Sequence, residues 1–323
     1  MTKKITANQP VLSIIIVSYN TAALTKKCLE SIISDASHSV RLKNRVEVIV
    51  IDNKSSDNST EIIEKTLATA PNILHGQLIK NKTNTGFAQA NNLGLAKAKG
   101  EFLLLLNSDT VVQTGALDAL INGLQSTAAK EQRVGLLAAS LWNPDGTYQN
   151  QGGDQVSLLA VASQWLLLDD LPFVGVFLPS MQKKYQGNIP KPSFQTFGWV
   201  AATALCFSHE TYKQLGDLDK SIFMYAEDVE YCLRAQKAGL NVALTQQARI
   251  THIGSASGSS DQAVLGEVRG LLSIWPHYFS QRSTICLKLL IGLGSVLRIT
   301  VFGLSGNGAK AKLYAKVLKS LWV

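Results

Sequence analysis

The chain has 323 residues, of which 46% are hydrophobic and 17% are charged. This balance excludes a chain that is disordered throughout, and it supports one large domain with an appendage or two domains. The four cysteines form no Cys-x-x-Cys pair, which argues against a disulfide framework or a zinc site and indicates a reducing compartment. The opening residues MTKKITANQP lack an apolar run, so we expect no secretory signal.

The net charge of +8 is concentrated at the C-terminal end of the chain. The segment from Arg269 to Val323 contains eight basic residues and no Asp or Glu, whereas the rest of the chain has 23 basic and 23 acidic residues. A basic segment of this kind binds nucleic acid, an anionic membrane surface or an acidic partner.

Apolar runs and helix-like segments alternate along the N-terminal third of the chain. Continuous Ile-, Val- and Leu-rich runs predict buried strands, and the segments between them predict helices. The strands are expected over 11–19, 46–51, 73–80 and 102–106, and the helices over 21–34, 60–69 and 89–99, the last ended by Gly100. This alternation predicts an α/β fold with a mostly parallel, Rossmann-like sheet flanked by helices, whose ligands bind at the carboxyl ends of the strands.

The second half of the chain predicts fewer regular elements. Strands are expected over 134–141, 199–207 and 242–250, and a helix over 227–238 ended by Gly239. The stretch between them, about residues 150–195, is apolar but broken by prolines and acids, so we expect an insertion that packs near the site or touches lipid. We therefore predict an α/β domain over residues 1–260 and a basic, helical C-terminal region over residues 261–323.

Two groups of polar residues follow predicted strands in the N-terminal half. Asp52 ends the run VIVID, where a carboxylate can accept the imide N–H of uracil or thymine; the alternative is an Asp that caps a turn or a helix. Asn107-Ser108-Asp109 ends the run FLLLL, where an Asp can ligate a divalent ion that bridges a diphosphate. The alternative there is again a turn.

Two further candidates lie in the C-terminal half. Glu227-Asp228 begins a predicted helix, and one of these carboxylates can take the proton of an acceptor hydroxyl. The alternative is a pair of first-turn acids favoured by the helix dipole. His252, past the end of a predicted strand in the loop-like segment THIGSAS, is a candidate metal ligand or diphosphate donor, or else a hydrogen-bonded structural histidine.

The order and spacing of these segments are similar to those of a known family. The chain resembles the family 2 glycosyltransferases of GT-A fold, especially the bacterial rhamnosyltransferase-like members. The resemblance rests on SIIIVSYNT (13–21), VIVIDNKSSDNS (48–59), NTGFAQANNLGLAKAKGEFLLLLNSDT (84–110), GWVAATALCFSHETYKQLGDLDKSIFMYAEDVEYCLRAQKAG (198–239) and THIGSAS (251–257).

The resemblance implies an inverting, Mg²⁺- or Mn²⁺-dependent enzyme. It would move a sugar, with L-rhamnose suggested by the subgroup, from a dTDP- or UDP-sugar to a cell-surface glycan or a lipid-linked saccharide. It implies that Asp228 is the general base, that Asp109 and His252 bind the metal, and that Trp199 and Glu227 bind the acceptor. The implied nucleotide- and donor-binding residues are Tyr19, Asn20, Asp52, Asn53, Gly86, Asn91, Asn107 and Asp109.

Some positions depart from the family pattern. Asn107 replaces the first Asp of the D-x-D-like element, and the text around 200–204 and 215–219 differs from that of many relatives. Because of these departures, the alternative remains that the chain is a catalytically inactive module that binds a nucleotide or a glycan. A dinucleotide-dependent oxidoreductase is excluded, because the first strand is followed by SYNTAAL and not by G-x-G-x-x-G.

The apolar pattern of the basic C-terminal region indicates a membrane. Residues 285–304 are long enough to span a bilayer, but Arg298 inside the run would be costly there. Residues 309–323 predict a helix with two faces: Leu313, Tyr314, Val317, Leu318, Leu321 and Trp322 on one, and Lys312, Lys316 and Lys319 on the other.

We therefore expect an interfacial helix on an anionic membrane surface and a cytoplasmic protein that is peripheral on the inner face of the cell membrane. The alternative is a helix docked on the core. We expect no nucleic-acid binding, because the basic residues are not interleaved with a stacking platform.

Overall fold

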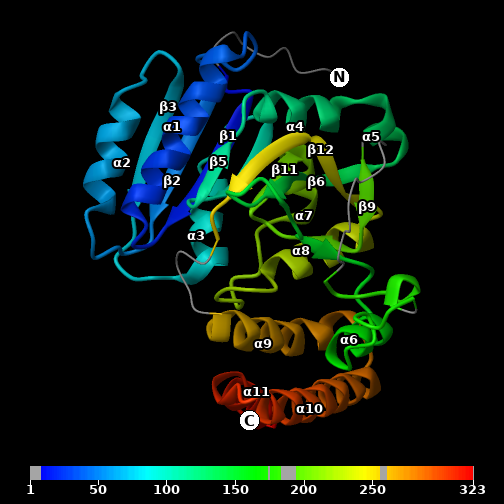
Figure 1. Ribbon diagram of the computed structural model, residues 1–323. Coiled ribbons are helices and arrows are strands. Elements are labelled where there is room, and N and C mark those ends of the chain that lie inside the picture. The colour runs from blue at the N-terminus through cyan, green and yellow to red at the C-terminus, as the bar shows by residue number, and fades with distance from the viewer. Residues whose placement is uncertain (1–8, 174, 183–193, 255–259, 323) are drawn as a thin grey trace.

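A ten-stranded mixed sheet lies at the centre of the molecule, and the C-terminal helices stack below it (Figure 1). The computed structural model describes residues 9–173, 175–182, 194–254 and 260–322. The first eight residues, part of the predicted insertion and the end of the THIGSAS match therefore lie outside the described residues.

The first four long strands form a fully parallel block in the order β3-β2-β1-β4. The chain builds outward from β1 to β2 and β3 and then returns to place β4 on the opposite side of β1, so the strand order reverses between β1 and β4. In open α/β sheets, such a reversal opens a ligand crevice at the carboxyl ends of the strands. The bounds of the block are β1 (Leu12–Ser18), β2 (Val46–Asp52), β3 (Leu74–Lys80) and β4 (Phe102–Asn107).

The rest of the sheet mixes the two strand directions. The antiparallel strand β11 (Ala204–Ser208) lies between β4 and β6 (Val134–Trp142), and β12 (Asn241–His252) pairs in parallel with β6. Three short strands complete it: β5 (Thr110–Val112), β7 (Tyr148–Gln149) and β9 (Gln195–Phe197). The predicted fold class, an α/β protein with a mostly parallel central sheet, is confirmed.

Helices cover both faces of this sheet because alternate residues of each strand point to opposite sides. On β1, Ile14 and Ile16 face one buried core and Ile15 faces the other. The first core is closed by α1 (Ala22–His38), α2 (Ser59–Ala68) and α4 (Ala116–Gln125), and the second by α3 (Gly86–Leu95) and α8 (Glu227–Lys237). The short helices α5 (Thr127–Glu131) and α7 (His209–Leu215) lie in the connections.

Several predicted boundaries were wrong. The helix expected over 89–99 begins at Gly86, where the Asn84 side chain accepts a hydrogen bond from the Gly86 amide (3.0 Å), and it ends at Leu95. Gly100 does not end it; the Gly100 amide donates to Ser13 Oγ (2.8 Å) beside the start of β4. The helix expected over 21–34 continues to His38. The elements β5, α4 and α5 were not predicted.

The strand expected over 199–207 is divided in two. Trp199–Val200 form β10, which pairs with β8 (Gly152–Gly153) in a separate sheet, and β11 begins only at Ala204. The residues between them leave the ladder: the Ala202 amide donates to Asp228 Oδ2 (3.3 Å), and the Thr203 carbonyl accepts from the Asn107 amide (2.9 Å). The interruption therefore turns backbone groups toward residues that were predicted to be functional.

A third hydrophobic core joins the predicted insertion to the C-terminal helices. It contains Trp165 of α6 (Leu158–Trp165), Trp275 of α9 (Ser260–Tyr278), Leu287 of α10 (Gln281–Leu304) and Val317 of α11 (Gly308–Ser320). The single-turn helix η1 (Gly175–Phe177) lies in the insertion. Among the described helices, α10 alone has the length and apolar composition to cross a membrane, a test that core helices of soluble proteins can also pass.

The apolar face of α11 is not free for a membrane. Leu313, Val317 and Leu321 are buried, and Tyr314 and Leu318 pack against the same core. Packing against α9 and α10 covers the apolar face of α11. For this face, the structure therefore agrees with the alternative, a helix docked on the protein. Only Trp322 remains largely exposed.

Candidate active site

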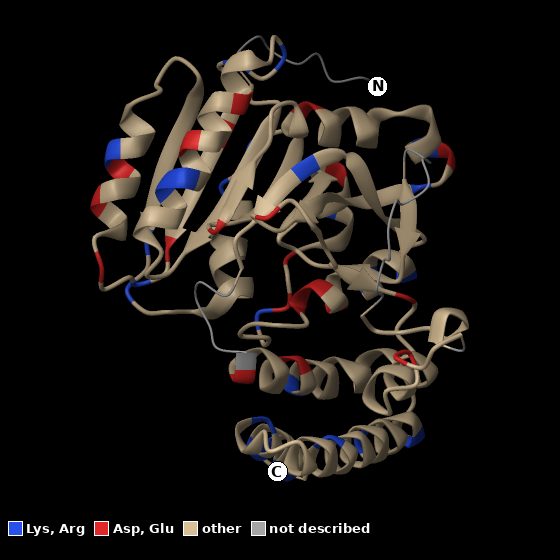
Figure 2. Cartoon of the chain, in the orientation of Figure 1, with Lys and Arg blue, Asp and Glu red and all other residues tan. Residues whose placement is uncertain are grey.

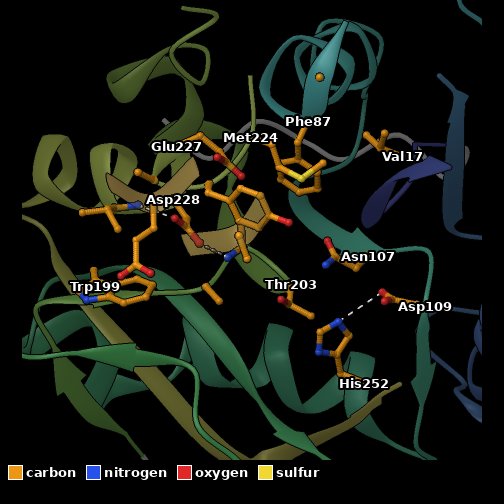
Figure 3. A pocket seen from close by; sticks show the side chains of 18 of the residues that line it. Val17, Phe87, Asn107, Asp109, Trp199, Thr203, Met224, Glu227, Asp228 and His252 are labelled. Carbon is orange, nitrogen blue, oxygen red and sulfur yellow. Dashed lines mark hydrogen bonds and ion pairs between the residues drawn. The ribbon is translucent and has the colours of Figure 1, made fainter. Parts of the chain in front are cut away.

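A pocket of about 460 Å³ opens at the carboxyl ends of β1 and β4, where the sheet topology places a ligand crevice. The loops after these strands form one side of it, and the segment before α8, together with α9, forms the other. Figure 3 shows Asn107, Asp109 and His252 grouped at one end, with Glu227, Asp228 and Trp199 grouped apart from them. Nine of the predicted site residues line the pocket: Tyr19, Asn53, Gly86, Asn107, Asp109, Trp199, Glu227, Asp228 and His252.

Asn53 organises the loop that follows β2 at one side of the pocket. Its side-chain amide nitrogen donates to Asn84 Oδ1 (2.8 Å) and to the Gly86 carbonyl (3.2 Å), and its Oδ1 accepts from the Thr85 amide (3.1 Å). Because Asn53 is buried, each of these bonds replaces one to water and fixes the start of α3. Asn53, which was predicted as a site residue, therefore lines the pocket and holds the shape of its wall.

Gly86 is placed where only glycine fits. Its φ is +81°, and a Cβ built on it would overlap the carbonyl oxygen of Phe223. The next amide, that of Phe87, donates to the same carbonyl (2.7 Å). The start of α3 is therefore joined directly to the segment that precedes α8.

Three predicted donor-binding residues do not line the pocket. Asn20 Oδ1 accepts from the Ser56 amide (2.7 Å), and Asn91 donates to the Phe87 carbonyl within α3 (3.0 Å), so both tie backbone together. Asp52 is buried beside Asn53, and its Oδ2 accepts from the Ser55 amide (3.2 Å), as expected of a turn-capping Asp. Asp52 Oδ1 has no hydrogen-bond partner among the described residues.

Asn107, Asp109 and His252 form a polar group at the other end of the pocket. His252 is the last residue of β12 and does not lie in a loop, as the sequence had suggested, because β12 continues to pair with β5 up to this position. Its Nε2 lies 3.3 Å from Asp109 Oδ1. Asn107 Oδ1 is buried and has no partner within the part of the chain that the structure describes.

The orientation of the His252 ring suits a metal ligand. Gln149 Nε2 donates to Asn143 Oδ1 (3.2 Å), which turns Gln149 Oε1 toward His252, and the ring Nδ1 donates to that oxygen (2.7 Å). In the tautomer with the proton on Nδ1, the lone pair of Nε2 would face Asp109. A histidine that ligates a metal is held in the same way, by an acceptor on its other nitrogen.

These residues fit a divalent cation only together with a substrate. Within the described ranges, no group of three or more His, Cys, Asp or Glu side chains is close enough to hold a metal. Asp109, His252 and the unpartnered Asn107 Oδ1 supply two oxygens and one nitrogen. Mg²⁺ commonly takes one or two carboxylates from a protein and its remaining ligands from water and substrate phosphates, so the set fits an ion carried with a diphosphate.

Glu227, which is buried, and Asp228, which is half-buried, are adjacent carboxyl groups at the start of α8. Asp228 Oδ1 accepts from the Val229 amide (2.8 Å), Oδ2 accepts from the Ala202 amide, and burial raises the pKa of Asp228 to about 6. Burial, and then the Asp228 charge, raise the pKa of Glu227 to about 8. Both carboxyl groups therefore hold their protons to a higher pH than an ordinary Asp or Glu does, and together they can supply a proton acceptor and a hydrogen-bond donor.

The backbone before this pair is strained. Tyr225 and Ala226 have φ values of +69° and +76°, and two consecutive non-glycine residues in this region are uncommon. Helix α9 packs closely against this turn at two glycines. A Cβ on Gly266 would overlap the Tyr225 ring, and a Cβ on Gly270 would overlap Ala226. The close approach of α9 thus holds the turn that presents Glu227 and Asp228 to the pocket.

Residues 13–130 match the protein-family model described as Glycosyl transferase family 2. The match begins in β1 and ends in α5, so it contains the parallel strands, the Asn53 loop and Asp109. Residues 13–130 therefore form a family 2 glycosyltransferase domain.

Two curated proteins are similar to the chain over about four fifths of its length. The N-acetylglucosaminyl-diphospho-decaprenol L-rhamnosyltransferase of Mycobacterium tuberculosis is 25% identical over 266 residues, which cover 78% of this chain and 79% of the relative. The O-antigen biosynthesis protein RfbC of Myxococcus xanthus is 27% identical over 259 residues, and the match covers 78% of this chain but only 18% of the relative.

Solved structures share the GT-A fold with the transferase. GalNAc-T7, solved with UDP, GalNAc and Mn²⁺, is 16% identical with a TM-score of 0.58, and the match covers 84% of this chain and 49% of that one. The mannosyltransferase PcManGT of Pyrobaculum calidifontis, solved with GDP-Man and Mn²⁺, is 14% identical with a TM-score of 0.54 over 98% of this chain and 88% of that one. At these identities the likeness shows the fold.

The sequence of the glycosyltransferase did not point to several residues that line the pocket. Glu267 of α9 and Gln182 of the insertion contact each other (Oε1 to Nε2, 3.5 Å), and Met181 accepts from the Trp199 indole through its carbonyl (2.8 Å). All three lie outside the matched segments, in stretches where the sequence shows only an insertion or an amphipathic helix. The available signal was the Gly266/Gly270 spacing, one helical turn apart, which marks a close helix contact.

Proposed function

We propose that this chain is an inverting glycosyltransferase in which Asp228 is the general base and Asp109, Asn107 and His252 hold a divalent cation with the donor diphosphate. The observation that carries the proposal is one pocket with a raised-pKa carboxylate pair at one side and an Asp–His pair with an unpartnered amide oxygen at the other. An acceptor base and a leaving-group site on opposite sides of a sugar are what inversion requires.

The residues act in a direct sequence. The Asp228 carboxylate takes the proton of an acceptor hydroxyl as its oxygen attacks the anomeric carbon, and the bond from that carbon to the diphosphate breaks. The neutral Glu227 donates a hydrogen bond to the acceptor, and Trp199 supplies a face for its sugar ring. A bound Mg²⁺ or Mn²⁺ would neutralise charge on the departing diphosphate.

The donor is proposed to be a dTDP- or UDP-sugar. Asp52 Oδ1, which is buried and without a partner among the described residues, would accept the imide N–H that uracil and thymine share. Tyr19, one residue beyond β1, and the Asn53 loop form the neighbouring wall. L-rhamnose is proposed as the sugar because the Mycobacterium tuberculosis relative is an L-rhamnosyltransferase.

The acceptor is proposed to be a cell-surface glycan or a lipid-linked saccharide, used at the cytoplasmic face of the cell membrane. The relative's name specifies a diphospho-decaprenol acceptor, and this chain has a basic, apolar C-terminal region whose helices lie below the sheet in Figure 1. A membrane-linked acceptor and a membrane-facing enzyme would meet without diffusion through bulk solution.

The test is the isosteric substitution Asp228→Asn with a panel of dTDP-, UDP- and GDP-sugars and Mn²⁺. We expect transfer to fall about 10²- to 10⁴-fold while the donor still raises the melting temperature, because the base acts on the acceptor. Asp145→Asn, in an exposed turn away from the pocket, is the matched control and should retain full activity. Full activity in Asp228→Asn would refute the base; donor binding without any turnover in the wild type would favour an inactive binding module.

A further inference from the structure

One face of α10 is apolar and exposed. Side chains on it include Leu293, which is 60% exposed, and Leu304, which is 86% exposed. At 100° per residue the face covers an arc of roughly 160°, opposite the buried residues Leu287 and Ile291. We define the α10 apolar face by Ile285, Leu289, Leu293, Val296, Val301 and Leu304.

The opposite side of α10 is fixed to the protein by Arg298. The Arg298 guanidinium donates to the carbonyls of Gln164 (2.7 Å) and Trp165, at the carboxyl end of α6, and lies over the Trp165 ring (5.1 Å). A cation at the negative end of a helix is favourable, and these bonds replace the water that the guanidinium loses. Arg298 therefore points away from the α10 apolar face and toward the core.

Helix α11 runs antiparallel along α10 and carries exposed lysines. Phe302 stacks on Tyr314 (5.8 Å) at one end of the pair, and Lys288 lies over the exposed Trp322 ring (5.6 Å) at the other. Lys312, Lys316 and Lys319 are exposed along α11, and neither helix contains an acidic residue. Figure 2 shows these two helices, the layer farthest from the sheet, with basic residues only.

We propose that α10 lies in the plane of an anionic membrane surface, with its apolar face in the acyl boundary and the α11 lysines among the headgroups. The inference rests on the proposed lipid-linked acceptor and specifies the surface that would face the lipid. Exposed apolar residues, flanking lysines and a tryptophan are the features of a helix that lies in the interface.

The same contacts argue against a helix that crosses the bilayer. Spanning would carry Arg298 and its partners in α6 into hydrocarbon, together with the α11 lysines that run beside α10. Charged side chains at that depth are costly. A second copy of the chain is a poorer occupant of the face, because two acid-free, lysine-bearing surfaces would repel each other.

The position of α9 connects this surface to the pocket. Helix α9 contacts α10 on one side, and its residues Ala263, Glu267 and Leu271 line the pocket. Helix α9 therefore packs against both α10 and the pocket that contains Asp228.

The first experiment measures sedimentation of the full chain with vesicles of phosphatidylcholine, with and without 30 mol% (about one lipid in three) phosphatidylglycerol. We expect binding to the anionic vesicles and a loss of at least about tenfold in Leu289→Glu/Leu293→Glu, because two carboxylates would enter the acyl boundary. Val40→Glu/Leu93→Glu adds the same charge at exposed apolar positions outside the C-terminal helices and should bind as the wild type does.

Asp228→Asn should sediment like the wild type, so a failure of the proposed catalysis is distinguished from a failure of this inference. Wild-type protein that stays in solution, or unchanged binding of Leu289→Glu/Leu293→Glu, would overturn it. A wild-type dimer in gel filtration that Leu289→Glu/Leu293→Glu converts to a monomer would also overturn it, in favour of a self-association surface.

The second experiment measures the depth of α10 directly. Cys286 is the exposed cysteine of the four, so a fluorophore on it reports one end of the helix, and Leu304→Cys in a Cys286→Ser background reports the other. These positions are about 27 Å apart along the axis. Quenching by lipids labelled at known depths should place both at the same shallow level; one shallow and one deep or opposite-leaflet position would show a spanning helix and refute the in-plane arrangement.

Discussion

The two sides of the pocket are built in different ways. On the side proposed to bind the donor, the ends of parallel strands place Tyr19, Asn53 and Asn107, and a network of side-chain hydrogen bonds closes the loops between them. On the side proposed to bind the acceptor, Asp228 depends on a turn with two left-handed residues that is held by glycine contacts from α9.

The comparison shows where each side is sensitive. Strand pairing distributes its stability over many bonds, so the donor side should depend on the chemistry of single ligands more than on their exact packing. The acceptor side should respond to small changes in volume far from the reacting atoms, because close packing holds a backbone that is unfavourable by itself.

After Asp228→Asn, loss of a donor-side ligand gives the largest expected effect. Asp109→Asn keeps the size of the side chain but removes its charge, so we expect transfer to fall about 100-fold or more. The thermal shift that dTDP produces with Mn²⁺ should disappear, whereas Asp228→Asn should retain it. Equal donor-induced shifts in the two variants would contradict the division of the pocket into donor and acceptor sides.

Acid pH should weaken the acceptor side next. Burial raises the pKa of Asp228 to about 6, so its carboxylate is available above that pH and is protonated below it. We expect kcat/KM to fall about tenfold for each pH unit below 6. This fall would begin at a higher pH than the pKa of an ordinary Asp would give. A profile that stays flat from pH 8 to pH 4.5 would exclude Asp228 as the base; Glu227→Gln should preserve the acid limb.

A single methyl group on α9 should disturb the turn. The Cβ of Gly270→Ala would overlap Ala226, so we expect a loss of about 1–3 kcal/mol in the free energy of unfolding and a larger loss of activity than of donor affinity. Denaturant titration measures the first and steady-state kinetics the second. Gly303→Ala, with no atom near its Cβ, is the matched control and should be neutral or slightly stabilising.

Glu267→Gln should have the smallest effect. Glu267 lines the acceptor side and contacts Gln182, so loss of its charge should raise the acceptor KM about fivefold, which corresponds to one hydrogen bond of about 1 kcal/mol. The donor KM should not change. A change in the donor KM alone would show that Glu267 acts on the donor side of the pocket.

The same division separates what the sequence predicted from what it did not. The parallel strands and the position of Asp109 follow from apolar runs that end in polar residues, a pattern visible in the sequence. The interruption at Ala202, the turn at Tyr225 and the contribution of α9 depend on contacts between distant segments, which have no local pattern. Likewise, periodicity found both faces of α11, but only packing shows that its apolar face is covered and that of α10 is not.

The contact between Gly86 and Phe223 has a consequence for engineering. The start of α3 on the donor side and the segment before α8 on the acceptor side meet at one carbonyl, which accepts from Phe87 and leaves no room for a side chain at Gly86. The two halves are therefore not interchangeable modules. A chimera that takes its sugar-nucleotide half from one relative and its acceptor half from another must keep the contact between Gly86 and Phe223. Otherwise the turn that presents Asp228 will change its conformation.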